Sequence, residues 1–342
     1  MVFVAVHAGA GFQSEANRSK YLTVCKEACA EGVKQTSAIE AVVSAICCLE
    51  DNQITNAGFG SNLCNDGSVE CDASLMDGDT LQWAAVGALN GIKNPIKVAK
   101  LLLNEQIRES RNKYGLVAPN MLVGEGAKKW ALKNGAEACD SLVSVRSKQC
   151  YVKYKRKIES ANCSDNDRAK HQRLDTVGAV AVDAEGKVAA AVSSGGILLK
   201  NPGRVGQAAM YACGVWAEDC IAVTTSGVGE YLTKTLFAKE CASYLQIKDD
   251  SLNAQKLHDA LLNKFINSKF LKNVTDEKSV GCITALVDSE NDCIEFLWGH
   301  NTQTMALAYC TQGTKPVAVF SKLPQTSELV VNSILLPFKC EK

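Results

Sequence analysis

Apolar residues recur at helical spacing through the first 140 residues. A helix is expected from 14 to 35, because four apolar side chains fall on one face there (Leu22, Cys25, Cys29 and Val33). A second helix is expected to start at Ser37, since Glu40 stands three residues later, as in a capping box. Similar spacing predicts helices over 95–108 and 123–134. The first part of the chain is therefore predicted to be largely helical.

Alternating apolar residues predict β-strands at the N-terminus and in the second half. The opening "MVFVAVHAGAG" is expected to be a first strand. Two hairpins are expected over 176–196 and 282–298, each with a polar turn between two alternating runs. Helical patterns lie between the hairpins, at 205–217, 228–245 and 252–265. Paired strands with helices in blocks between them favour an α+β fold of antiparallel sheets over a doubly wound parallel sheet.

Two segments interrupt these patterns. Residues 55–78 are dense in Gly, Asn and Asp, which favours turns around short strands. Residues 146–173 hold nine basic and three acidic residues and few apolar ones, which predicts a flexible, solvated linker. Its "KYKRK" run fits a nuclear-import signal or a nucleic-acid patch, and it equally fits a solvated loop.

Composition narrows the class of protein. The chain has 342 residues, of which 46% are hydrophobic and 22% charged, as is ordinary for a globular protein. The formal net charge is zero, so the chain as a whole does not indicate a nucleic-acid or membrane partner. Sixteen cysteines without a recognisable secretory signal indicate reduced thiols. No CxxC pair is present and the four histidines lie far apart, so no metal site is predicted.

The stretch "RLDTVGAVAV" contains the first candidate for chemistry, Thr176, where a polar segment meets an alternating strand. A threonine hydroxyl needs a base beside it to act as a nucleophile. If the Asp175–Thr176 bond is cut, the new α-amine lies on the same residue. Its pKa of about 7.7–8.0, against about 10.4 for lysine, leaves part of it neutral near pH 7 and able to accept the hydroxyl proton. A β-branched residue that simply starts a strand is the plain alternative.

Residues that could serve such a nucleophile follow within about 55 positions. Ser194, in "SSGG", ends the return strand of the hairpin and should lie beside Thr176. Arg204, in "NPGRVGQ", offers a bidentate fork for a carboxylate. Ser226 and Gly227, in "TTSGVGE", stand at a Gly-rich entry into a helix, where N–H groups can stabilise an oxyanion. Together these residues indicate a hydrolase.

Four residues upstream are weaker candidates. Asn56, Gly58 and Asp72 could line or support the site, although turn formation alone explains Asn and Gly in such a segment. Tyr21 and the loop 9–15 could frame the cleft, and a tyrosine in the core of the first helix is the alternative. Their roles stay open at this point.

Eight motifs resemble the type 2 asparaginase family of N-terminal nucleophile (Ntn) hydrolases, and most of all its threonine aspartase (taspase) branch. They keep the family's order over nearly the whole chain: "HAGAG", "TNAGFGSN", "ECDASLMDG", "VGALNGIKNP", "LDTVGAV", "SSGG", "NPGRVGQ" and "TSGVGE". The resemblance implies a four-layer αββα sandwich, made as a proenzyme of one domain, 1–342. It implies self-cleavage into an alpha subunit, 1–175, and a beta subunit, 176–342, and a dimer of two such cleaved units. No cofactor is implied.

The same resemblance implies roles for the residues named above. Thr176 is then nucleophile and base, and Ser194 is its hydroxyl partner. Arg204 is the carboxylate clamp, and the oxyanion hole consists of Ser226 with Gly227. The family usually has threonine where Ser226 stands, which keeps the hydroxyl.

Gln207 bears on the substrate. Asparaginases of this family place an aspartate there, which would pair with the free α-ammonium of an amino acid. In a peptide that nitrogen is acylated and neutral, so an aspartate facing it would be an unpaired buried charge, at a cost of several kcal/mol. A glutamine fits a peptide. The expected activity is therefore a threonine endopeptidase that cuts after aspartate, both at Asp175 and in other proteins.

Two other functions remain open. An L-asparaginase or β-aspartyl peptidase would act on small molecules, and an uncleaved pseudoenzyme would serve as a binding scaffold. The taspase resemblance implies protein substrates among nuclear transcription regulators, such as trithorax-type histone methyltransferases and transcription factor IIA. It implies a location in nucleus and cytoplasm, with neither nucleic acid nor a membrane as a direct partner.

Overall fold

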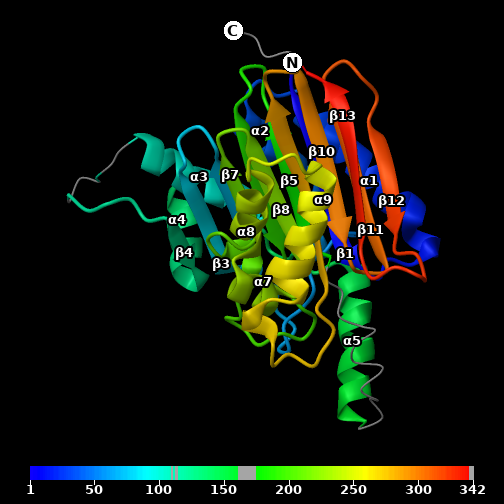
Figure 1. Cartoon of the computed structure of the whole chain (residues 1–342). Helices are drawn as coiled ribbons and strands as arrows, with labels where there is room; N and C mark the ends of the chain where they lie inside the picture. The colour runs from blue at the N-terminus through cyan, green and yellow to red at the C-terminus, as the bar shows by residue number, and fades with distance from the viewer. Residues whose placement is uncertain (109–110, 112–114, 161–174, 339–342) are drawn as a thin grey trace.

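The computed structural model of the uncut chain describes residues 1–108, 111, 115–160 and 175–338. Two sheets lie face to face, and helices cover the outer face of each (Figure 1). The predicted four-layer αββα sandwich is confirmed, because helix, sheet, sheet and helix follow one another through the molecule.

The larger sheet brings the N-terminus beside the strand that follows Thr176. Its eight strands run in the order β12-β11-β1-β5-β6-β2-β3-β4, and neighbours are antiparallel except β3 and β4. Their bounds are β1 Phe3–Gly11, β2 Cys71–Asp77, β3 Trp83–Leu89, β4 Met121–Val123, β5 Val177–Val182, β6 Val188–Ser194, β11 Thr304–Thr311 and β12 Val317–Lys322.

The smaller sheet is built entirely from residues after Thr176. Its five antiparallel strands run in the order β13-β10-β9-β8-β7. Their bounds are β7 Val215–Glu218, β8 Ile221–Gly227, β9 Val280–Asp288, β10 Cys293–His300 and β13 Val330–Pro337. The two expected hairpins are confirmed, as β5–β6 in the larger sheet and β9–β10 in the smaller one.

Separate groups of helices cover the two sheets (Figure 1). The larger sheet packs against α1 Arg18–Gly32, α2 Ala38–Glu50, α3 Pro95–Arg108 and α4 Gly124–Lys133. The smaller sheet packs against α8 Phe237–Leu245 and α9 Asn253–Asp259, with α7 Gly229–Thr235 beside them. The helices expected in the first 140 residues are confirmed, and the side chain of Ser37 accepts a hydrogen bond from the backbone N–H of Glu40, as the capping pattern predicts.

Strand β5 is apolar on both faces because it separates two cores. Val177, Ala179 and Ala181 pack toward α1–α3. Val180 and Val182 face the smaller sheet. A strand buried on both faces reads as a continuous apolar run rather than a strict alternation. This burial fixes the residue that precedes the strand, Thr176, between the two layers.

The helix expected over 205–217 is wrong. The chain forms a short 3-10 turn at Gln207–Ala209 and then strand β7. Val215 and Ala217 are buried in the core between the sheets, and pairing with β8 supplies the backbone hydrogen bonds. Tertiary burial therefore overrides the local helical spacing. The helix expected over 228–245 is divided into α7 and α8 at Leu236, whose φ is 50°.

The linker expected over 146–173 is wrong for its first half, which is the helix α5, Val145–Glu159. Ser144 and Ser147 form a reciprocal capping box at its start, and Lys and Arg are good helix formers. The helix extends away from the body of the protein (Figure 1), and the Tyr151 hydroxyl donates a hydrogen bond to the Asn65 carbonyl at its base. Residues 161–173 lie outside the described residues.

Two observations concern membranes and metals. Within the described part of the chain, no helix is long and apolar enough to cross a membrane. The same residues contain no group of three or more His, Cys, Asp or Glu side chains placed to hold a metal ion. The fourteen cysteines among them are free thiols.

Candidate active site

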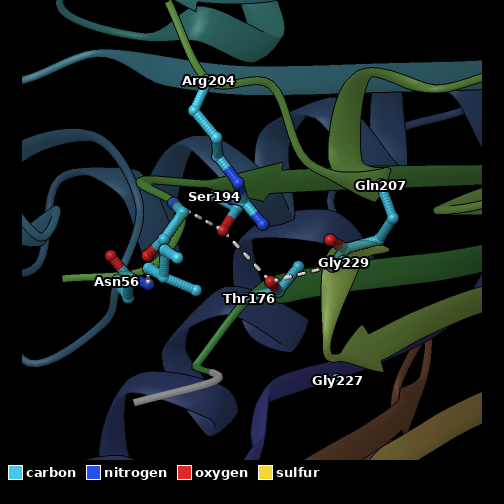
Figure 2. A pocket seen from close by; sticks show the side chains of 9 residues that line it. Asn56, Thr176, Ser194, Arg204, Gln207, Gly227 and Gly229 are labelled. Atoms are coloured by element: carbon cyan, nitrogen blue, oxygen red, sulfur yellow. Dashed lines mark hydrogen bonds between the residues drawn. The ribbon is translucent and has the colours of Figure 1, made fainter. Parts of the chain in front are cut away.

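Thr176 lies directly before β5, and its hydroxyl contacts Ser194 (Figure 2). The sheet register pairs Val177 with Ser193, which brings the next residue of β6 beside Thr176. The Thr176 hydroxyl donates to Ser194 Oγ over 3.1 Å, and the same Oγ accepts the Gly196 N–H at 3.0 Å. The structure therefore brings together the first two residues that the motifs single out.

Gln207 also contacts the hydroxyl oxygen of Thr176. Its Nε2 donates to Thr176 Oγ1 over 3.2 Å, and its side chain is buried. Figure 2 shows this amide and Ser194 on either side of Thr176. The space beside them is a pocket lined by Asn56, Thr176, Ser194, Gly196, Ile197, Arg204, Gln207, Gly227 and Gly229.

Arg204 points into this pocket from the turn before Gln207 (Figure 2). Its Nε and Nη2 each donate to a carboxylate oxygen of Glu230, both over 2.9 Å. A Cβ built on Gly196 would lie 2.8 Å from Nη1, so the glycine backbone packs closely against the guanidinium there. The expected clamp thus lies in the pocket, and Glu230 is a partner that the motif reasoning missed.

The two residues expected to form an oxyanion hole lie in different surroundings. Gly227 lines the pocket at the end of β8, with a φ of 152°. The Ser226 side chain is fully buried, and its Oγ accepts the Ala10 N–H at 3.0 Å. The described pocket lining includes Gly227 and Gly229, whereas Ser226 joins β8 to β1 through its contact with Ala10. Gly229 was not singled out, although the "GVGE" sequence signals a Gly-rich helix entry.

Asp175, the residue before Thr176, contacts Tyr21, so α1 reaches the segment that precedes β5. The Tyr21 hydroxyl donates to Asp175 Oδ2 over 3.5 Å, and Arg146 Nη2 donates to that hydroxyl over 3.1 Å. Tyr21 is almost completely buried. Gly9 closes the other side of Asp175, since a Cβ on it would lie 2.4 Å from the Asp175 Cα. The end of β1, rather than a loop that starts at residue 9, therefore packs against Asp175, because β1 extends to Gly11.

Asn56, Gly58 and Asp72 support the pocket to different degrees. Asn56 lines it, and its Nδ2 donates to the Gly196 carbonyl over 2.8 Å. The Asp72 carboxylate lies behind the pocket and accepts the Gly206 N–H at 2.8 Å, which anchors the turn that carries Arg204. Burial raises the pKa of Asp72 above its ordinary value. Gly58 is outside the lining and packs against Glu50, where a Cβ would lie 2.5 Å from the Glu50 carbonyl.

His7 lies in β1 opposite Gly178 of β5, and the motif reasoning gave it no role. Its Nδ1 accepts the Gly9 N–H at 3.3 Å, and Thr224 Oγ1 is 3.5 Å from Nε2. Burial lowers its pKa to about 3, so the ring is neutral at pH 7. A Cβ on Gly178 would lie 2.3 Å from Nε2, and glycine at this place lets β5 approach the ring. His7 therefore packs as a neutral ring between Gly178 of β5 and Thr224 of β8.

Glu50 is a buried carboxyl group on the helix side of β6. Its Oε1 accepts the Ser193 hydroxyl at 2.6 Å and the Ile96 N–H at 3.1 Å. Burial raises its pKa from 4.5 to about 8. The folded protein therefore keeps a proton on Glu50 near pH 7, while the unfolded chain loses it above about pH 4.5.

This difference predicts that Glu50 destabilises the protein as pH rises. The folded-state pKa is the higher one, so the contribution is fully favourable below about pH 4.5 and is lost up to about pH 8. The free energy of unfolding should fall by at most about 1.4 kcal/mol per pH unit in this window. Glu50→Gln removes the titration, so its free energy of unfolding should rise relative to the parent between pH 5 and 8.

Urea unfolding of uncut chains at several pH values checks this expectation. Both proteins would carry Thr176→Ala, so that a single chain unfolds, and the buried His7 cancels because both contain it. Glu31→Gln, at an exposed glutamate paired with Lys34, is the matched control and should stay parallel to the parent. Parallel curves for Glu50→Gln would show that Glu50 titrates normally in the folded protein.

Comparison with known proteins gives a consistent result over most of the chain. The family model Asparaginase_2, described as asparaginase, matches residues 1–318. The chain is 35% identical to a plant-type L-asparaginase of Thermococcus kodakarensis, over 78% of this chain and 86% of that protein. It is 34% identical to the plant-type L-asparaginase of Pyrococcus abyssi, over 92% and 97%. An isoaspartyl peptidase/L-asparaginase of Xenopus laevis is 37% identical, over 69% and 73%.

These relatives carry the names of asparaginases and isoaspartyl peptidases, so they establish the family and not its threonine aspartase branch. The sandwich fold, the buried threonine at the start of β5 and the Arg204 pocket agree with that assignment. The chain therefore belongs to the type 2 asparaginase family of Ntn hydrolases.

Proposed function

We propose that this protein cuts itself between Asp175 and Thr176 and then acts as a threonine endopeptidase that cleaves protein chains after aspartate. The observation that carries this proposal is that Arg204 and the neutral side chain of Gln207 line the same pocket beside Thr176. Arg204 suits the carboxylate of the substrate, and Gln207 suits a neutral peptide nitrogen.

Self-cleavage would use the intact peptide bond before β5. Thr176 Oγ attacks the Asp175 carbonyl carbon, the C–N bond breaks, and the nitrogen receives the hydroxyl proton. This N→O acyl shift leaves an ester between Asp175 and the threonine oxygen. Water then hydrolyses the ester, which gives a carboxylate on Asp175 and a free amine on Thr176. The contact of the Thr176 hydroxyl with Ser194 orients the attacking oxygen.

Cleavage of a substrate would use the new amine as the base. It accepts the Thr176 hydroxyl proton while Oγ attacks the carbonyl after a substrate aspartate. The leaving amine takes up a proton as the acyl-enzyme forms, and water then releases the product. Gly227 and Gly229 lie at the wall where N–H groups can stabilise the oxyanion, and losing one such donor lowers rates by about 10²–10³ in other enzymes.

A second candidate is an L-asparaginase or isoaspartyl peptidase acting on small molecules. The relatives favour it, because proteins more than 30% identical to this chain are named for those activities. Both candidates share the nucleophile and the clamp. They differ in whether the substrate nitrogen near Gln207 is a free α-ammonium or part of a polypeptide.

Incubation of the cleaved protein with a matched substrate set separates the candidates. The set consists of one peptide with Asp, Asn, Glu or isoAsp at the scissile position, together with free L-asparagine. Mass spectrometry identifies the products. We expect cleavage of the peptide with Asp at the scissile position and of no other substrate in the set. Ammonia release from L-asparagine, or hydrolysis of the isoAsp peptide without cleavage after Asp, would establish the second candidate instead.

Gln207→Asp should shift the preference toward substrates with a free α-amine. An aspartate next to an acylated nitrogen is a buried charge without a partner, and its cost of several kcal/mol should lower kcat/KM for the Asp peptide at least about a hundredfold. The same variant should gain activity on L-asparagine. Gln207→Asn, which is neutral, is the matched control, and an equal loss in both variants would contradict a role for charge.

The biological setting is a further part of the proposal. We infer protein substrates among nuclear transcription regulators, a location in nucleus and cytoplasm, and assembly of two cleaved units. The basic run Lys155–Lys157 on α5 supports a nuclear location, because short basic runs of this kind serve as import signals. Microscopy of the full chain and of a variant with Lys155, Arg156 and Lys157 changed to Gln tests this inference.

A further inference from the structure

We propose that Glu230 is a positioning residue for substrate binding, which holds one edge of the Arg204 guanidinium so that the other edge receives the substrate carboxylate. This inference rests on the proposed function of the pocket. It assigns a role to a residue that contacts neither Thr176 nor the pocket floor.

The contact between the two residues uses a defined part of the guanidinium. Nε and Nη2 donate to the two oxygens of Glu230, both over 2.9 Å. A guanidinium has five N–H donors in a rigid plane, and this arrangement engages the edge formed by Nε and Nη2. The N–H groups of Nη1 and the second one of Nη2 form the other edge, which remains for a second carboxylate.

The free edge faces the pocket because glycines surround it. A Cβ on Gly196 would lie 2.8 Å from Nη1, and one on Gly206 would lie 2.9 Å from it. Gly229 stands next to Glu230 at the start of α7, and a Cβ on it would lie 2.9 Å from Nη2. Side chains at these positions would crowd the guanidinium and force it to shift, whereas the glycines let it keep its place in the pocket lining.

Arg204 would be poorly fixed without this contact. It lies on an extended turn whose backbone is anchored by the Asp72 carboxylate at Gly206. That anchor fixes the main chain, whereas a long arginine side chain keeps several rotatable bonds. The bidentate contact with Glu230 fixes the plane of the guanidinium, which limits the entropy lost when a substrate carboxylate binds.

Exposure makes the contact suitable for positioning rather than for competing with the substrate. The Arg204 side chain is 15% exposed and that of Glu230 is 49% exposed. Water therefore screens the repulsion between Glu230 and an incoming carboxylate. The net expectation is that removing Glu230 weakens substrate binding more than it slows the chemical step.

Steady-state kinetics on the cleaved protein tests this role with the Asp peptide as substrate. Glu230→Ala should raise KM about tenfold or more, since it removes a charge-assisted contact, while kcat changes less than about threefold. Glu230→Gln keeps one acceptor oxygen, so its KM should lie between that of the parent and that of Glu230→Ala. Glu240→Gln on α8, which breaks a similar exposed ion pair with Lys264, is the matched control and should resemble the parent.

Other outcomes would overturn the role of Glu230. A lower KM would identify Glu230 as a competitor of the substrate, and an unchanged KM would remove it from substrate binding. A fall in kcat alone would place its effect on the chemical step. A loss of thermal stability in Glu230→Ala, with normal KM in a stable Glu230→Gln, would make its role structural.

A binding measurement separates this inference from the proposed function. N-acetyl-L-aspartate carries the carboxylate and a neutral acylated nitrogen, and its dissociation constant can be measured by calorimetry without turnover. If the parent binds it and Glu230→Ala binds it about tenfold more weakly, the positioning role stands even if no Asp peptide is cleaved. Equal binding by the two proteins would overturn the positioning role, whatever the enzyme cleaves.

Discussion

Thr176→Ala should leave the protein as one uncut chain without hydrolase activity. The substitution removes the hydroxyl oxygen that attacks the Asp175 carbonyl in the proposed mechanism, and an alanine side chain offers no replacement for it. It also prevents formation of the free amine that acts as the base for substrates. The expected loss exceeds that of any single oxyanion donor, which is about 10²–10³ in other enzymes. A denaturing gel and mass spectrometry of the purified protein measure the first effect directly.

Thr176→Ser is the matched control because it keeps the hydroxyl and removes only a methyl group. It should still be cut, with a fragment that begins at residue 176. The unaltered protein should show the same fragment, which a pseudoenzyme scaffold would lack. Processing of Thr176→Ala at the normal position would assign the nucleophile to another residue and would contradict the mechanism proposed above.

The sequence predicts well those elements whose pattern and packing agree. α3 spans the expected residues, Pro95–Arg108, and the β5–β6 hairpin places Ser194 beside Thr176. In both cases the side chains that create the pattern are also the ones that are buried. The helix expected over 205–217 is wrong because Val215 and Ala217 gain more by entering the sheet core than by local helical spacing.

Site residues on motifs were predicted, whereas their partners across the fold were not. Thr176, Arg204, Gln207 and Gly227 line one pocket, as expected. Glu230 follows one of those motifs, but only the fold places its carboxylate on Arg204. Likewise, nothing in the sequence around His7 indicates which residues its buried ring contacts. Such pairings depend on contacts between distant segments, which spacing in one sequence does not reveal.

The motifs also do not reveal which side chain contacts the aspartate before Thr176. The motifs suggest that self-cleavage after Asp175 and cleavage of substrates share one preference for aspartate. In the uncut chain, however, Asp175 Oδ2 lies 3.5 Å from the Tyr21 hydroxyl, while Arg204 is paired with Glu230. In the uncut chain the aspartate before Thr176 therefore contacts Tyr21 rather than Arg204, the group proposed to hold a substrate aspartate.

Arg204→Ala should consequently separate the two reactions. Self-cleavage should proceed, because Tyr21 and strand β1 at Gly9 hold Asp175. Cleavage of the Asp peptide should lose about a hundredfold or more in kcat/KM, since hydrogen bonds to a charged group contribute about 1.5–3 kcal/mol each and the clamp offers two. Glu230 is half-exposed, so its carboxylate stays hydrated when the arginine is removed and the fold should persist.

Two measurements on one preparation check this separation. The fraction of cut chain on a denaturing gel reports self-cleavage, and peptide hydrolysis reports the reaction in trans. Arg204→Lys should keep self-cleavage and recover only part of the peptide activity, because lysine supplies charge without a planar fork. Arg18→Ala, at an exposed arginine paired with Glu15, is the control for loss of a surface charge. If Arg204→Ala remained uncut while still folded, Arg204 would hold Asp175 during self-cleavage, and one clamp would serve both reactions.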